Sequence, residues 1–393
     1  MPCTVLSSDC LPTSALSPKR CAGLRPSASS AAARGRSSAA RVSRPFGRGS
    51  PSRLSLRVEP AMARYRRVSR AVRSAIADRF SAKDSIVALS ADVRIDGKTC
   101  LVTGANSGLG MAVAIDLARR GGRVLMACRG GHPEAGEAVR RESGSDAVEM
   151  LKVDLADLGS VHNLCDGLAK RNAKLDVAVL NAGLMPRTAR RSTDGYEIMF
   201  AVHFLANRVL VDRWLRDGVV EPSTDAGRRP RLIQITSETH RSAEAIDFER
   251  FGEFADYGIR DGIRYYGLSK LHSCTFAREL HRRLNSDGEL RVAVHAMCPG
   301  PIASNIARDA PLVLKPILVP VMKLLFASPA KAARPVSYLC CSTEAGAQSG
   351  LYLHMMQEKQ PGESAADPVA GARLWQASET LVRRHMPASA SLD

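Results

Sequence analysis

Apolar runs alternate with helical patterns from Thr99 onward, and this alternation constrains the fold more than any other feature of the sequence. Each run is apolar throughout, as expected for a strand that is covered on both faces of a sheet. The predicted strands span residues 99–103, 123–128, 148–153, 175–181, 231–236, 290–297 and 351–354. The predicted helices span residues 109–120, 133–143, 157–171, 195–216, 263–284 and 329–341. The pattern predicts an α/β fold, a doubly wound parallel sheet of Rossmann type, in a single domain of about 280 residues.

A glycine-rich turn follows the first predicted strand. Gly104, Gly108 and Gly110 come directly after Thr103, and the next helical pattern begins at once. In such a sheet, ligands bind beyond the carboxyl ends of the strands, and glycine lets backbone N–H groups approach a pyrophosphate closely. The following helix presents the positive end of its dipole to that charge. The turn therefore predicts a dinucleotide-binding site, with a simple tight turn as the alternative.

The end of the second predicted strand indicates which dinucleotide binds. An acidic residue there would hydrogen-bond the ribose 2′-hydroxyl of NAD, whereas an arginine would accommodate the 2′-phosphate of NADP. In this chain Cys128 is followed by Arg129, and no acid is present. Charge complementarity between guanidinium and phosphate favours NADP(H) over NAD. An ordinary surface arginine is the alternative.

Five short motifs occur in an order typical of one enzyme family. They are TGANSGLG (103–110), NAG (181–183), TSETH (236–240), YGLSK (266–270) and CPG (298–300). From about Asp96 to about His385 the chain resembles the short-chain dehydrogenase/reductase family. Within it, the chain looks most like the branch of the retinol dehydrogenases and WW-domain oxidoreductases, which neighbours the protochlorophyllide reductases.

The resemblance assigns further residues to the cofactor. The residues that would line the phosphate loop, beside the three glycines, are Asn106, Ser107 and Leu109. Those contacting the adenine would be Asp154 and Leu155, and those lining the coenzyme ribose would be Asn181, Ala182 and Gly183. Those flanking the nicotinamide would be Pro299 and Gly300.

A tyrosine and a lysine one helical turn apart supply the chemistry that a carbonyl reduction needs. Tyr266 and Lys270 are i and i+4 in one predicted helix, so both face the same way. Hydride transfer to a carbonyl leaves negative charge on its oxygen, and a proton donor must neutralise that charge. Free tyrosine has a pKa of about 10, and a neighbouring ammonium is expected to lower it. We therefore expect Tyr266 as general acid/base, assisted by Lys270 and by Ser237, which would hydrogen-bond the carbonyl; Tyr266 and Lys270 would also contact the cofactor.

His203 departs from the family pattern. Relatives usually have an asparagine at this position, where it helps to hold a water in a proton relay behind the lysine. A histidine can still donate or accept through a ring nitrogen, or fill space while its backbone carbonyl holds the water. Proton supply is the step that this departure affects.

The sequence predicts an NADP(H)-dependent oxidoreductase that interconverts a carbonyl and an alcohol on a lipophilic small molecule. The resemblance also implies a homodimer through the helices near 195–216 and 263–284. Besides a basic RNA- or membrane-surface protein that would use residues 1–75, two other functions stay open. One is a catalytically silent NADPH-binding scaffold or redox sensor. The other is a protochlorophyllide-reductase-like plastid enzyme, which is disfavoured because no cysteine lies between Ser237 and Tyr266.

The positive charge of the chain lies mostly in its first 70 residues. These hold 14 Lys/Arg against Asp9 and Glu59, a net charge of +12, while the rest of the chain carries only +5 of the total +17. The tail lacks interleaved aromatic residues, so we expect no nucleic-acid partner. Its 13 serines within 60 residues are typical of an organelle transit peptide. We expect a plastid or mitochondrial location, or a cytoplasmic one if Met62 is the true start.

The longest apolar stretch is residues 310–327, which contain Lys315, Lys323 and three prolines. That composition is unsuited to a transmembrane span and favours an amphipathic helix or lid, with peripheral membrane contact as a further expectation. The ten cysteines form no CxxC pair, so we expect reduced, mostly buried thiols and no metal site.

These patterns divide the chain into four predicted parts. They are a disordered Ser/Arg-rich tail (1–61), a short helix and linker (62–94), the NADP-binding domain (95–385) and a flexible C-terminus (386–393).

Overall fold

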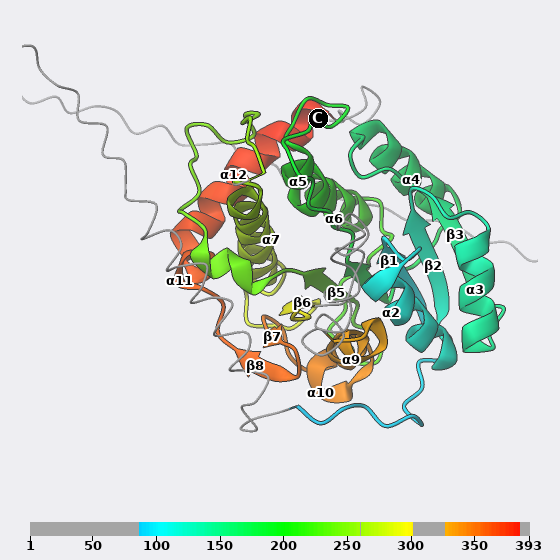
Figure 1. Cartoon of the computed structure of the whole chain (residues 1–393). Coiled ribbons are helices and arrows are strands. Elements are labelled where there is room, and N and C mark those ends of the chain that lie inside the picture. The colour runs from blue at the N-terminus through cyan, green and yellow to red at the C-terminus, as the bar shows by residue number, and fades with distance from the viewer. Residues whose placement is uncertain (1–85, 260, 302–326, 386–393) are drawn as a thin grey trace, which may run out of the picture. The chain divides into compact units, whose positions relative to one another are not determined.

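Eight strands form one sheet in the described part of the chain, in the order β3-β2-β1-β4-β5-β6-β7-β8 (Figure 1). The computed structural model describes residues 86–259, 261–301 and 327–385. The strands are β1 (Thr99–Thr103), β2 (Arg123–Cys128), β3 (Val148–Lys152), β4 (Val177–Leu180), β5 (Arg231–Ile235), β6 (Ala293–Cys298), β7 (Tyr352–His354) and β8 (Gln357–Lys359). Neighbours from β3 to β7 are parallel. The predicted doubly wound sheet is confirmed, and β8, which pairs antiparallel with β7, was not predicted.

The helices agree with the predicted ranges to within a few residues, apart from one interruption and four helices that were not predicted. They are α2 (Gly108–Arg119), α3 (Glu134–Ser143), α4 (Leu158–Lys170), α5 (Ile198–Phe200), α6 (Ala206–Arg216), α7 (Gly262–Leu284), α9 (Pro329–Cys341), α10 (Thr343–Gly346), α11 (Glu363–Ala366) and α12 (Pro368–Arg384). A π-helical turn, η1 (Ala201–Leu205), divides the predicted helix 195–216, and a 3₁₀ helix, η2 (Glu238–Ser242), follows β5. The helices that were not predicted are η2, α10, α11 and α12, although Asp367 caps α12 and Pro368 opens it.

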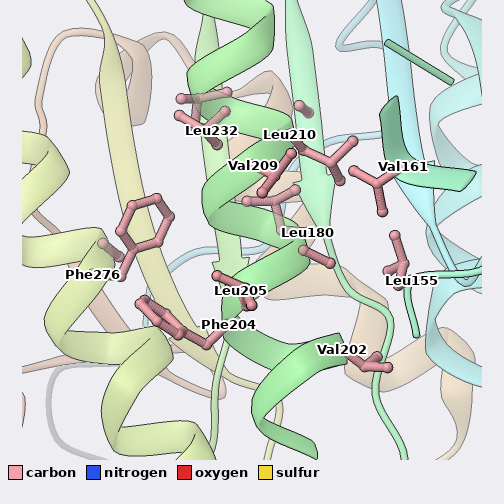
Figure 2. Close-up of a cluster of buried hydrophobic side chains, with 14 of the residues drawn as sticks. Leu155, Val161, Leu180, Val202, Phe204, Leu205, Val209, Leu210, Leu232 and Phe276 are labelled. Atoms are coloured by element: carbon pink, nitrogen blue, oxygen red, sulfur yellow. The ribbon is translucent and has the colours of Figure 1, made fainter. Parts of the chain in front are cut away.

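The sheet is buried on both faces because its side chains alternate between two hydrophobic clusters. In β1, Leu101 belongs to the cluster under α4, α6 and α7, whereas Val102 belongs to the cluster under α2 and α9. Figure 2 shows part of the first cluster, where sheet residues meet residues of the covering helices: Leu180, Leu232, Val209, Leu210 and Phe276. Because the strands from β3 to β7 are parallel, their carboxyl ends lie at the same edge of the sheet. The strand order reverses between β1 and β4, which is where such sheets bind ligands.

Several predictions concern residues outside the described ranges. These are the basic tail (1–61), the helix expected before residue 86, the apolar stretch up to residue 326 and the C-terminal residues 386–393. The location, the domain boundaries and the peripheral membrane contact stay predictions. The seven cysteines in the described residues are free and buried, as expected. In that same part of the chain, no helix is both long and apolar enough to cross a bilayer.

Candidate active site

The turn between β1 and α2 requires glycine at three positions for two different reasons. Gly104 (φ 65°) and Gly108 (φ 57°) have left-handed backbone conformations that favour glycine. A Cβ on Gly110 would lie 2.4 Å from the carbonyl oxygen of Gly104 and 2.5 Å from Nδ2 of Asn181. No side chain therefore fits where α2 crosses the ends of β1 and β4.

The first turn of α2 is open to an anion. Its N-cap, Ser107, is exposed and makes no side-chain cap hydrogen bond, and the turn contains no acidic residue. A Cβ on Gly108 would meet nothing within 4 Å. The first N–H groups of a helix have no intrahelical acceptor and attract negative charge. These residues therefore fit the diphosphate of a dinucleotide.

Arg129 and Asp154 lie together at the ends of neighbouring strands. Arg129 follows β2, Asp154 follows β3 after one further residue, and the two strands are paired. Nη1 of Arg129 is 3.7 Å from Oδ2 of Asp154, and 68% of the Arg129 side chain is exposed. The guanidinium is thus accessible to a phosphate group from solvent. The adjacent Leu155 is buried in the core, as is Leu109 at the start of α2.

The turn after β4 is tied to the end of β1. Nδ2 of Asn181 donates a 2.8 Å hydrogen bond to the carbonyl oxygen of Thr103. The backbone N–H groups of Asn181 and Ala182 both donate to Oγ1 of Thr103, at 2.9 and 3.0 Å. The predicted ribose-binding turn and the glycine turn are therefore held as one unit.

The three predicted catalytic side chains come together at the carboxyl end of β5. Ser237 directly precedes η2, and its hydroxyl is hydrogen-bonded to Tyr266. Nζ of Lys270 lies 5.7 Å from the centre of the Tyr266 ring and donates to the carbonyl oxygen of Ile235 at 3.2 Å. A Cβ on Gly183 would lie 3.6 Å from the same Nζ. The turn after β4 thus forms one wall of the site.

Burial controls the protonation of this pair. Burial raises the pKa of Tyr266 to about 12, although its hydrogen bond with Ser237 acts in the opposite direction. Burial also lowers the pKa of Lys270 to about 8. The pKa of the phenol is therefore raised overall, and the expected net decrease is not found in this structure. Burial disfavours the charged form of both groups and is the largest cause of each shift.

The turn after β6 lies beside the one after β5. Pro299 is buried, and Gly300 has a φ of 75°. A Cβ on Gly300 would lie 2.9 Å from Cγ of Met355, so the backbone passes close to the end of β7. The nicotinamide contacts assigned to Pro299 and Gly300 stay a prediction.

Two residues support the site although the sequence patterns assigned them no role. The hydroxyl of Thr103 accepts hydrogen bonds from the backbone N–H groups of Asn181 and Ala182. His240 donates from Nδ1 to the carbonyl oxygen of Ser237 at 2.6 Å, and its Nε2 accepts from the N–H of Gly362 at 2.9 Å. For Thr103, the only signal in the sequence is a polar side chain at the end of an apolar strand. For His240, no local signal exists, because its second partner is far along the chain.

Comparison with known proteins finds dehydrogenases that are similar to this chain. A family model described as "short chain dehydrogenase" matches residues 98–241. The chain is 33% identical to retinol dehydrogenase 14 of Mus musculus over 300 residues. This match covers 73% of this chain and 86% of that protein.

Solved structures show the same arrangement of strands and helices. A crystal structure of an uncharacterised protein from Mycobacterium Paratuberculosis superposes with a TM-score of 0.57 at 27% identity, covering 76% of this chain and 98% of that one. The angucycline C-6 ketoreductase LanV with bound NADP gives a TM-score of 0.51 at 26% identity, covering 67% and 95% of the two chains.

Proposed function

Since the chain belongs to the short-chain dehydrogenase/reductase family, on its retinol-dehydrogenase-like branch, we propose that it uses NADP(H) to interconvert a carbonyl and an alcohol on a lipophilic small molecule. Membership makes the chain a nicotinamide-dependent oxidoreductase that acts on alcohol or carbonyl groups. One observation carries the finer proposal. The hydrogen-bonded hydroxyls of Ser237 and Tyr266 lie beside Lys270, where the ends of β4 and β5 meet.

The raised pKa of Tyr266 suits a proton donor in the reductive direction. With a pKa of about 12, the phenol keeps its proton throughout the physiological range. When bound, the nicotinamide supplies the hydride. Tyr266 donates its proton to the carbonyl oxygen, and Ser237 orients that oxygen by a hydrogen bond. Lys270 is mostly protonated at neutral pH, and its charge stabilises the phenolate that remains after proton transfer.

Arg129 supports the choice of NADP over NAD. Its exposed guanidinium lies at the end of β2, where the 2′-substituent of the adenosine ribose is recognised in sheets of this type. The carboxylate of Asp154 lies 3.7 Å away, and 68% of the Arg129 side chain stays exposed. LanV, a structural relative, has bound NADP.

Exposed apolar side chains near the start of α7 support a lipophilic substrate. Ile263 lies one turn before Tyr266 on α7 and is exposed, as are Ile259 and Met185. A Cβ on Gly262 would lie 3.6 Å from the carbonyl oxygen of Pro186, so the segment after β4 lies against the start of α7. Exposed large apolar residues that lie beside a site favour the binding of a lipophilic ligand.

The test is turnover of a panel of aldehydes and ketones, retinal included, with NADPH and with NADH. Tyr266→Phe should lower kcat by roughly 10²–10⁴-fold, because it removes the proton donor, while NADPH affinity stays close to that of the wild type. Tyr265→Phe is the matched control. Tyr265 stacks on Tyr257 with ring centres 4.4 Å apart, so we expect the control to keep its activity.

Two results would contradict the proposal. Normal turnover in Tyr266→Phe would mean that another group donates the proton. Tight NADPH binding without reduction of any carbonyl would instead favour the silent scaffold or redox sensor.

A further inference from the structure

His203 lies in the π-helical turn η1 and touches both halves of the candidate site. Its side chain has no exposed surface. Nε2 accepts a 2.9 Å hydrogen bond from the backbone N–H of Leu184, and Nδ1 is 2.8 Å from Oγ of Ser269. Leu184 follows Gly183 in the turn after β4, and Ser269 directly precedes Lys270 on α7. One ring therefore joins a cofactor-binding turn to the helix that carries the proton donor.

The partners of the ring define its protonation state. A backbone N–H can only donate, so Nε2 must be an unprotonated acceptor, and the hydrogen of the neutral ring lies on Nδ1. That hydrogen is donated to Ser269, whose hydroxyl donates in turn to the carbonyl oxygen of Tyr266 at 2.8 Å. Burial and the charge of Lys270 lower the pKa of His203 well below its usual value. A protonated ring would lose the contact with Leu184.

The backbone of His203 is already fully engaged. Its carbonyl oxygen accepts from Oγ of Ser273 at 2.9 Å and from Nδ2 of Asn207 at 2.8 Å. The contribution of His203 to the site therefore comes from its ring. The ring also packs edge-on against Tyr266, with ring centres 5.7 Å apart and an interplanar angle of 89°. Irregular turns of this type occur frequently at functional sites.

We propose that His203 is a positioning residue, whose neutral ring sets the distance between the Gly183–Leu184 turn and the part of α7 that carries Tyr266 and Lys270. This proposal rests on the proposed function and adds to it the group that aligns cofactor and proton donor. The ring makes two hydrogen bonds that can be removed separately, which we call the Nε2 arm and the Nδ1 arm. The Nε2 arm holds the turn that receives the cofactor, and the Nδ1 arm holds the backbone of the proton donor.

The two arms can be tested one at a time. His203→Phe keeps the ring but removes both hydrogen bonds. It should weaken NADPH binding about tenfold and lower kcat about tenfold, in line with the cost of an unpaired buried donor and a shifted reacting group. A glutamine amide reaches about as far as Nε2, so His203→Gln should restore NADPH affinity but not kcat. An asparagine amide reaches about as far as Nδ1, so His203→Asn should restore kcat but not affinity.

His272→Phe is the matched control for the loss of a buried histidine. His272 lies on α7 and packs against Phe200, Phe204 and Phe251, and its Nδ1 has no hydrogen-bond partner among the described residues. We expect this variant to keep both NADPH affinity and kcat. The measurements are a fluorescence titration with NADPH, steady-state kinetics with the best carbonyl of the panel, and Tm for every variant.

The inference is overturned if folded His203→Phe matches the wild type in both quantities, or if His203→Gln and His203→Asn lose the same quantity. The NADPH titration keeps this result separate from the proposed function. If the wild type binds NADPH but reduces no carbonyl, the proposed function fails. The affinities of His203→Phe and His203→Gln still decide whether the ring positions the turn.

Discussion

The guanidinium of Arg208 on α6 donates a 2.7 Å hydrogen bond to the carboxylate of Glu379 on α12. The Arg208 side chain is fully buried, pairs also with Asp212 at 3.0 Å, and lies 4.0 Å from the ring centre of Trp375. The C-terminal helix α12 therefore packs against α6 and α7, and α7 carries the proton donor Tyr266 (Figure 1). The homodimer expected through these two helices stays a prediction, and it would have to accommodate α12.

Removing Glu379 should destabilise the fold. Glu379→Ala leaves the buried Arg208 with Asp212 as its remaining carboxylate partner among the described residues. Breaking a buried pair is costly, and because Asp212 remains we expect a loss on the order of 2 kcal/mol in the free energy of unfolding. Arg383→Ala is the control, because Arg383 makes an exposed pair with the same carboxylate, worth about 0.5 kcal/mol. Urea unfolding measures both, and equal losses would contradict the prediction.

Replacing Arg129 should change cofactor preference. Arg129→Asp places a carboxylate beside Asp154, where it repels a 2′-phosphate and can accept from a 2′-hydroxyl. We expect the ratio of kcat/KM for NADPH to that for NADH to fall by about 10–100-fold, the size of one charged hydrogen bond. Arg123→Asp changes the same charge at the opposite end of β2 and should leave the ratio unchanged. A shift of similar size in both variants would indicate a general effect of charge.

Gly110 should not tolerate a methyl group. In Gly110→Ala the Cβ would lie 2.4 Å from a backbone oxygen, so the glycine turn must shift. We expect a loss of about 1–3 kcal/mol in stability together with weaker NADPH binding. Gly167 is the control within a helix, because a Cβ there would meet nothing within 4 Å. Gly167→Ala should gain about 0.5–1 kcal/mol, and calorimetry with an NADPH titration distinguishes the two variants.

Lys270 should make the stability of the protein depend on pH. Burial lowers its pKa from 10.5 to about 8, so between these values the unfolded chain binds a proton that the folded protein does not. The free energy of unfolding of the wild type therefore rises with pH through this window, by on the order of 3 kcal/mol. Lys270→Met lacks this contribution. We expect the variant to be the more stable protein at pH 7, with the difference closing toward pH 10.

Urea unfolding of both proteins across this pH range checks the sign of the effect. Parallel curves for the wild type and Lys270→Met would show that Lys270 has an ordinary pKa in the folded protein.

The sheet, the glycine turn and the placement of Tyr266 and Lys270 on one face of α7 could all be predicted from the amino-acid sequence. These features depend on spacing within a single segment: apolar runs for strands, backbone freedom at Gly104 and Gly108, and an i, i+4 pair on a helix. Each can be read from a few neighbouring residues, and the structure agrees with each of them.

The environment of those residues, in contrast, depends on how distant segments pack together. The pKa of Tyr266 rises because distant segments bury it, and no spacing along α7 records that burial. His203 reaches Leu184 and Ser269 only because η1, the turn after β4 and α7 pack together. The position of α12 depends likewise on the hydrogen bond between Glu379 and Arg208, which are 171 residues apart in the sequence. Burial and long-range hydrogen bonds arise from packing between segments, so a pattern within one segment cannot specify them.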